Sequence, residues 1–144
     1  LRACTNSREL MQLVARELPR FDTGNVVVAF TCAAKTDEGR DMATLEPSPA
    51  WPKLQEQLIG CCHLLEPRGM SMTAYAAAKL VWGHEKLLNG LAQAGARRAA
   101  DFGATDIAKA CWAFAKLRYL EEPDAREFWR TVAREGERTL KTGR

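Results

Sequence analysis

Three lysines occupy matching places in the chain and are spaced as a phosphate-binding column would be. Lys79 follows Lys35 by 44 residues, and Lys116 follows Lys79 by 37 residues. Cations placed at regular intervals can neutralise successive phosphates of a nucleic-acid backbone. Lysine near the C-terminal end of a helix also stabilises the helix dipole and otherwise stays solvated. The column therefore has both a functional and a purely structural interpretation.

Aromatic and basic side chains at neighbouring positions could also contact a nucleic acid. Tyr75 and Trp112 could stack on bases, although their alanine and cysteine neighbours favour packing between helices. Lys109 shares its column with Val28 and Met72. Valine and methionine cannot read base edges through hydrogen bonds, which argues against sequence-specific recognition by this segment.

Two adjacent arginines, Arg97 and Arg98, form a second small basic spot, for which an ordinary solvated helix face is the alternative. The formal net charge of +3 is compatible with a polyanionic partner but too small to argue for one. The candidate RNA-binding residues are Lys35, Lys79, Lys109, Lys116, Arg97 and Arg98.

The residues that could perform catalysis or bind a metal form no recognisable set. Cys61, Cys62 and His63 are adjacent, but no second cluster supplies the remaining ligands of a metal site. The other histidine, His84, has no nucleophile or carboxylate partner at an interpretable spacing. The five cysteines are odd in number, which favours free, buried thiols in a reducing compartment. We therefore expect no enzyme activity, no metal, no cofactor and no small-molecule substrate.

The candidate lysines and aromatic residues recur at matching positions of an internal repeat. The segments "NVVVAFTCAAKT" (25–36), "GMSMTAYAAAKL" (69–80) and "DIAKACWAFAKL" (106–117) align without gaps. Their shared columns are Val26, Met70 and Ile107; Phe30, Ala74 and Cys111; and Ala34, Ala78 and Ala115. The same offsets align four further segments through the column Leu10, Leu54, Leu91 and Phe128 and the column Val14, Leu58, Gly95 and Val132. A third column holds Leu18, Cys62, Ala99 and Gly136.

The aligned apolar positions within each of these four segments are four residues apart, as on one face of an α-helix. The repeat unit is thus a first helix, a short turn and a second helix, about 37 residues long. We expect first helices over 6–18, 51–64, 85–99 and 123–139, and second helices over 25–36, 70–82 and 105–118. Asn25 and Asp106 are expected N-caps. The polar segment 36–49 reads as a long connection.

Paired helices with such a period predict an all-α fold, an α-solenoid of about seven helices. The composition, 47% hydrophobic and 27% charged, is that of an ordinary globular protein. The whole chain, 1–144, is one repeat segment with units 6–49, 50–83 and 84–122 and a partial unit 123–144, expected to belong to a longer array. We expect Leu54, Leu58, Ile107 and Cys111 to be buried, Ala78 and Ala115 to lie at helix contacts, and Trp51, Trp82 and Trp129 to be exposed.

Two motifs resemble those of the octotricopeptide repeat family and of the related heptatricopeptide repeats of apicomplexan organelles. "DIAKACWAFAKL" resembles the second-helix signature, and "EPSPAW" (46–51) resembles the proline-rich start followed by tryptophan. Departures exist, because this start is clear only before the second unit and the tryptophan column reads Thr31, Tyr75 and Trp112.

The resemblance implies single-stranded RNA binding in a chloroplast or mitochondrion, in the processing, stability or translation of transcripts. The alternative is a protein-binding scaffold in a large organellar assembly, such as a ribosome or a membrane complex, with no RNA contact of its own. Near-neutral charge and only three units suit the alternative. No apolar run approaches the roughly 20 residues that a membrane span requires.

Overall fold

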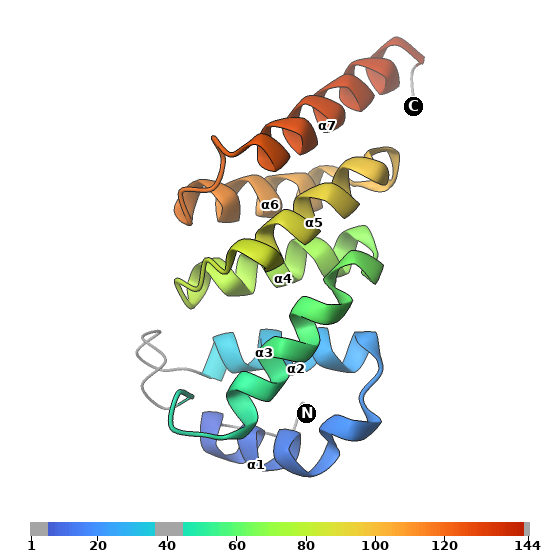
Figure 1. Ribbon diagram of the computed structural model, residues 1–144. Coiled ribbons are helices and arrows are strands. Elements are labelled where there is room, and N and C mark those ends of the chain that lie inside the picture. Colours follow the sequence, from blue (N-terminus) through green and yellow to red (C-terminus); the bar gives the residue numbers. More distant parts are fainter. Residues whose placement is uncertain (1–5, 37–44, 143–144) are drawn as a thin grey trace.

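The computed structural model describes residues 6–36 and 45–142, and within these ranges the chain is helical, with no strand (Figure 1). The seven α-helices there are α1 (Ser7–Glu17), α2 (Thr23–Thr36), α3 (Ala50–Cys61), α4 (Pro67–Lys79), α5 (Glu85–Arg97), α6 (Ala104–Lys116) and α7 (Pro123–Thr142). Single 3-10 turns, η1 (Leu18–Arg20), η2 (Cys62–Leu64) and η3 (Ala99–Asp101), follow α1, α3 and α5. The all-α class and every predicted helix are confirmed. The helix formed by "NVVVAF" is included, although its β-branched residues favour strand.

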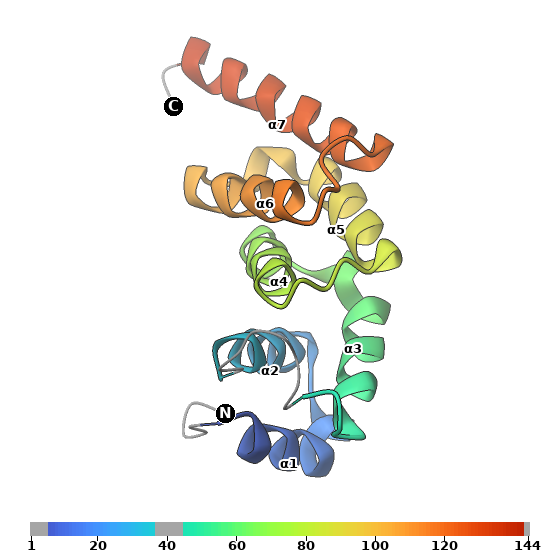
Figure 2. The same cartoon turned by 90° about the vertical axis from the view of Figure 1, so that its left-hand side faces the viewer.

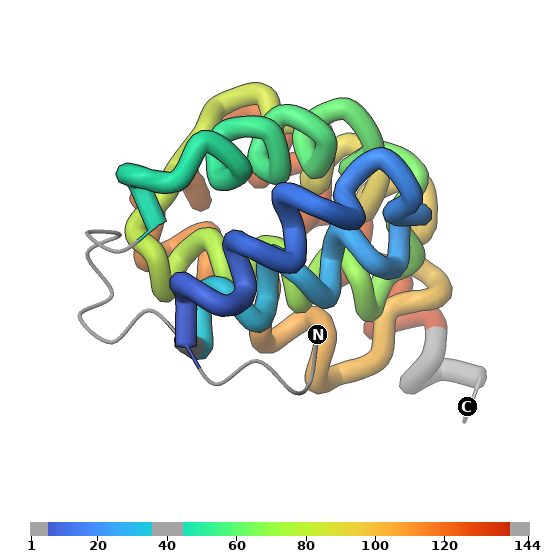
Figure 3. Tube along the Cα trace, turned by 90° about the horizontal axis from the view of Figure 1, so that it is seen from below, coloured from blue at the N-terminus to red at the C-terminus, as the bar shows by residue number. Residues whose placement is uncertain are grey.

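The helices lie in two layers (Figure 2). The second helices α2, α4 and α6 lie side by side in one layer, and α3 and α5 form the other, with α1 and α7 at the two ends. α4 packs against both α2 and α6, while α5 packs against η2 and α7. Seen along the stack, successive helices lie behind one another (Figure 3). The second helices all run in the same direction, since each is preceded by a first helix that runs back across it.

The predicted apolar columns of the first helices form the centre of the core. Every member of the column Leu10, Leu54, Leu91 and Phe128 is buried, and so is every member of the column Val14, Leu58, Gly95 and Val132. Burying a large apolar side chain stabilises a fold by about 1.5–3 kcal/mol. One continuous core therefore links α1 to α7.

The glycine in the second of these columns is explained by the aromatic residue opposite it. A Cβ atom on Gly95 would lie 2.8 Å from Cε1 of Phe128 and 3.5 Å from Cζ of Phe102. Phe128 cannot easily retreat, because Phe102 and Phe114 both contact its ring edge to face, at 5.3 and 5.8 Å between centroids. The close approach of α5 and α7 thus depends on the missing side chain.

The helix starts differ from the predicted caps. α2 begins at Thr23, two residues before Asn25, and the Asp22 carboxylate accepts the Asn25 amide at 2.8 Å. The side-chain oxygen of Asn25 in turn accepts a hydrogen bond from the backbone amide of Asp22 at 3.1 Å. The pair thus forms a reciprocal cap, with Asp22 outside the helix. The expected N-cap role of Asn25 is therefore wrong. The expected N-cap role of Asp106 is also wrong. Asp106 lies in the first turn of α6, whose N-cap is Gly103, and its carboxylate accepts a hydrogen bond from the Ser71 hydroxyl of α4.

α4 and α6 end in the same way, at residues 37 positions apart. Val81 and Arg118 adopt the left-handed conformation, with φ of 53° and 57°. Beyond Val81, the Trp82 amide donates to the Ala77 carbonyl at 2.8 Å, and beyond Arg118 the Tyr119 amide donates to Phe114 at 2.8 Å. This Schellman arrangement satisfies carbonyls that a helix end leaves free, but it usually places glycine at the left-handed residue.

Five burial expectations are wrong, and three of them concern α6. Ile107 and Cys111 are only half-buried and Ala115 is exposed, because no helix follows α6 on this side within the described residues. The equivalent Ala78 is fully buried between helices, as predicted. Trp51, expected on the surface, is buried and stacks on Phe30 with ring planes 2° apart.

The predicted long connection lies partly outside the described ranges. Residues 37–44 of the predicted connection lie outside them, while Leu45 and the turn before α3 lie inside, with Leu45 buried. Trp82, also expected to be exposed, is instead half-buried against the Phe30 ring, whereas Trp129 is exposed as expected. No helix in the described part of the chain is both long enough and apolar enough to cross a membrane.

Candidate nucleic-acid interface

One face of each second helix carries the candidate side chains. Residues three and seven positions apart lie on the same face of a helix. We call these nine residues the lysine face: Val28, Thr31 and Lys35 on α2; Met72, Tyr75 and Lys79 on α4; and Lys109, Trp112 and Lys116 on α6. None of them is buried, whereas their neighbours on the other faces of α4 are almost all buried. The lysine face is thus the solvent side of the second-helix layer.

Lysines and aromatic rings meet where α4 lies beside α6. The rings of Tyr75 and Trp112 are 5.0 Å apart between centroids, with their planes tilted by 40°. The Nζ atoms of Lys79 and Lys109 lie 5.0 and 5.7 Å from the Tyr75 centroid, and that of Lys116 lies 5.2 Å from the Trp112 centroid. Each ammonium group is attracted by the electron-rich face of a ring. We call these five residues the cation–aromatic cluster.

Sequence reasoning named all five residues but not their relation to one another. Tyr75 and Trp112 do pack between successive helices, as their neighbours suggested, yet 43% of Trp112 remains exposed. The spacing of four residues from Tyr75 to Lys79, and from Trp112 to Lys116, was the available signal, because such residues are neighbours on a helix. The approach of Lys109 to Tyr75 crosses from α6 to α4, and no local spacing predicts it.

α2 does not complete the cluster. Lys35 is exposed in the last turn of α2, at the position that Lys79 and Lys116 hold in α4 and α6. In place of an aromatic residue α2 has Thr31, whose hydroxyl donates to the Val27 carbonyl of its own helix at 2.7 Å. The lysine column thus extends across the three second helices, while the aromatic column covers two.

Arg97 and Arg98 lie elsewhere. They are at the C-terminal end of α5, which runs opposite to α4 and α6, so they are at the other end of the layers from Lys79 and Lys116. The Nε atom of Arg98 pairs with Asp101 at 3.4 Å. Arg97 lines an open groove of about 410 Å³ between α5 and α7, which also contains Asp124 and Glu127.

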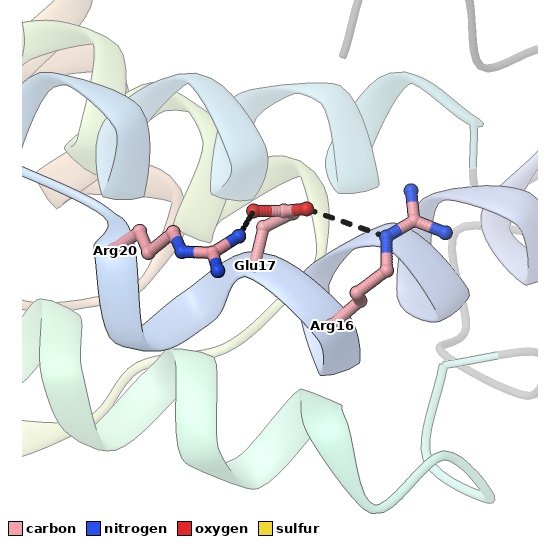
Figure 4. Close-up of polar contacts among 3 residues, drawn as sticks. All are labelled: Arg16, Glu17 and Arg20. Atoms are coloured by element: carbon pink, nitrogen blue, oxygen red, sulfur yellow. Dashed lines mark hydrogen bonds and ion pairs between the residues drawn. The ribbon is translucent and has the colours of Figure 1, made fainter.

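Arginines and lysines differ in their ion pairing. Every ion pair found among the described residues involves an arginine, and none involves a lysine. At the end of α1, Glu17 accepts hydrogen bonds from Arg20 at 3.0 Å and from Arg16 at 3.3 Å (Figure 4). These bonds, the Arg20 bond most of all, lower the pKa of the Glu17 carboxyl. The lysine face is therefore a region of positive charge that no carboxylate in the described ranges neutralises through an ion pair.

The adjacent Cys61 and Cys62, and Cys111 on α6, are partly or fully buried free thiols. Burial raises the pKa of Cys111 to about 11 and is also the main cause of raised pKa values at Cys61 and Cys62. The Cys62 thiol lies 3.2 Å from the Ile59 carbonyl, to which it donates. His63 beside it is exposed. The described residues contain no group of three or more His, Cys, Asp or Glu side chains that could hold a metal ion.

Comparison of the chain with known protein families, curated proteins and solved structures gives no match. The function must therefore be inferred from the geometry above.

Proposed function

We propose that the chain is a segment of an α-solenoid of helix–turn–helix repeats. Three observations support this architecture. Aligned positions of the first helices are buried together, as in the column from Leu10 to Phe128. The second helices lie side by side in one layer. The ends at Val81 and Arg118 share one unusual backbone geometry at the distance of one repeat.

We further propose that the lysine face binds single-stranded RNA, in the processing, stability or translation of transcripts in a chloroplast or mitochondrion. The observation that carries the RNA proposal is the cation–aromatic cluster. Aromatic rings offer stacking surfaces for bases, worth about 1–3 kcal/mol per base, and unpaired ammonium groups beside them can neutralise phosphates. The resemblance of the repeat motifs to the octotricopeptide family supports the choice of RNA and of the organelle.

The cluster suggests how a strand would be held. A base stacks on the exposed side of Trp112, and the adjacent phosphates lie near Lys116 and Lys109. Both lysines keep their ammonium groups on flexible stems, so each can leave its ring for a phosphate at small cost. Val28 and Met72 offer no hydrogen bonds on the same face, so binding should depend little on base sequence.

The test compares two triple variants of equal charge change. Lys79→Gln, Lys109→Gln and Lys116→Gln together should weaken binding of a labelled single-stranded RNA about tenfold or more at low salt. The slope of log affinity against log salt should flatten by about 1.4, since each of the two phosphate contacts, at Lys109 and Lys116, contributes about 0.7. The control changes exposed cations of the first helices, Arg8, Lys53 and Lys86, to glutamine.

If the two triple variants weakened RNA binding equally, binding would depend on net charge alone, and this result would contradict the proposed site. Trp112→Ala adds an independent arm, because it removes stacking without changing charge. Circular dichroism of each variant checks that the helices are intact.

The second candidate is the protein-binding scaffold. The exposure of Trp129 on α7 favours it, since tryptophan is enriched at the centres of protein interfaces. Absence of RNA binding by the unaltered chain, under low salt, would favour the scaffold over the RNA proposal.

A further inference from the structure

Positions that are buried in the earlier helices of the stack are exposed on α6 and α7, at its end. Ala34 of α2 and Ala78 of α4 are buried, but the equivalent Ala115 of α6 is exposed. Val27 and Ser71 are likewise buried. Their equivalent, Ala108, is exposed as well.

The first helices show the same contrast. Met11 of α1 and Ala92 of α5 are buried and Gln55 of α3 is half-buried, whereas the equivalent Trp129 of α7 is 48% exposed. Cys62 and Ala99 are buried, and Gly136 in their column is exposed. The exposed members of these columns all belong to α6 and α7, and together they make up the uncovered surface of these two helices. We call it the end face: Ala108, Ala115, Trp129 and Gly136.

A groove of about 610 Å³ opens at one end of this surface, between the start of α6 and the second half of α7. Phe102, Ile107 and Val132 contribute its apolar lining. The half-buried state of Ile107 is a consequence of this opening. The equivalent residues Val26 and Met70 are buried.

The interfaces inside the stack show what covers such a face. α4 covers α2 and α6 covers α4, in each case with a small buried residue at the same position of the covering helix, Ala76 or Ala113. At the second interface the covering helix also offers Asp106, whose carboxylate lies 2.9 Å from the hydroxyl of Ser71. The covering partner is therefore a helix with a small residue near its middle.

We propose that the end face binds a further helical hairpin, whose first helix packs on α6 as α6 packs on α4 and whose second helix packs on α7 as α7 packs on α5. Every open position belongs to a column that the next helix of the same layer covers elsewhere in the chain. The inference rests on the proposed repeat architecture but not on RNA binding, and its test contains no RNA.

A grafted hairpin tests the proposal in register. Gly136 is the equivalent of Ala99, so residues 1–136 are joined to a copy of residues 100–136, which carries a copy of α6 and most of α7. The grafted chain should melt about 5 °C or more above residues 1–136 alone and above the full chain. Hydrogen exchange of the α6 amides should slow at least about tenfold, because a packed helix now covers them.

The substitution Ala115→Arg supplies the decisive control. In the full chain it should leave the melting midpoint within about one degree, since Ala115 is exposed. In the grafted chain it should abolish the gain, because the arginine would lie where the new helix packs. The proposal would be overturned if the graft did not raise the melting midpoint, or if it raised the midpoint equally in the presence of Ala115→Arg. A full chain that self-associates and is made monomeric by Trp129→Glu would also overturn it, since a second copy would then be the occupant.

Discussion

At the scale of single residues, the core is held by pairs of positions whose sizes are matched between successive helices. Gly95 and Phe128 are the clearest pair, since the ring lies where a Cβ atom of residue 95 would be. Gly90 is in a similar position, where a Cβ atom would lie 2.6 Å from the Sγ atom of Cys62. Gly90 and Gly95 therefore mark close approach of neighbouring elements rather than turns.

The first prediction follows from this pair. Gly95→Ala should destabilise the fold by about 1–3 kcal/mol, because the added methyl group overlaps the Phe128 ring. Helix propensity alone would predict the opposite, a gain of about 1 kcal/mol. Thermal or urea unfolding measures the sign. Gly60→Ala is the matched control, since a Cβ atom there meets nothing within 4 Å and only the favourable propensity remains.

Several single residues could be predicted from the sequence and others could not. Leu54 and Leu58 were assigned to the core because their columns contain apolar residues in every unit. Ile107 and Ala115 have equally apolar columns, but their burial requires a helix beyond α6, and no column shows where a stack ends. The stacking of Trp51 on Phe30 is a tertiary contact across the long connection, which no periodicity records.

At the scale of the helix, the ends are specified less clearly than the middles. Val81 and Arg118 occupy left-handed positions without the glycine that usually signals them, so no local residue pattern predicts these two Schellman ends. The site shows the same limit. Lysine and aromatic residues within one helix could be paired from their spacing, but the contact of Lys109 with Tyr75 depends on how α6 lies against α4.

Relief of this backbone strain is the second prediction. Val81→Gly should stabilise the fold by about 1 kcal/mol, because a β-branched residue in the left-handed region costs more than the added flexibility of glycine. Little burial is lost, since 67% of Val81 is exposed. Val81→Ala serves as the control that removes the side chain but keeps the unfavourable φ. A gain with alanine equal to that with glycine would contradict the strain explanation.

At the scale of the whole molecule, each helix contacts its neighbours in the stack and little else. The principal contacts join α2 to α4, α4 to α6 and α5 to α7. Stability in such an arrangement is close to a sum of local terms, and the two ends have neighbours on one side only.

The third prediction concerns the order of local opening. Hydrogen exchange should be slowest in α4 and α5, which are covered on both sides, and fastest in α1 and in the second half of α7. Leu10→Ala should accelerate exchange in α1 and α2, while that of α6 and α7 stays unchanged. If this substitution accelerated exchange equally in all helices, the molecule would be a single cooperative unit instead.

The common direction of α2, α4 and α6 also gives one edge of the molecule an electric field of its own. Each helix C-terminus carries roughly half a negative charge, so three of them along one edge amount to about −1.5. Lys35, Lys79 and Lys116 lie in those last turns and reverse the sign of that edge. Without them the edge would not be neutral but would repel a polyanion.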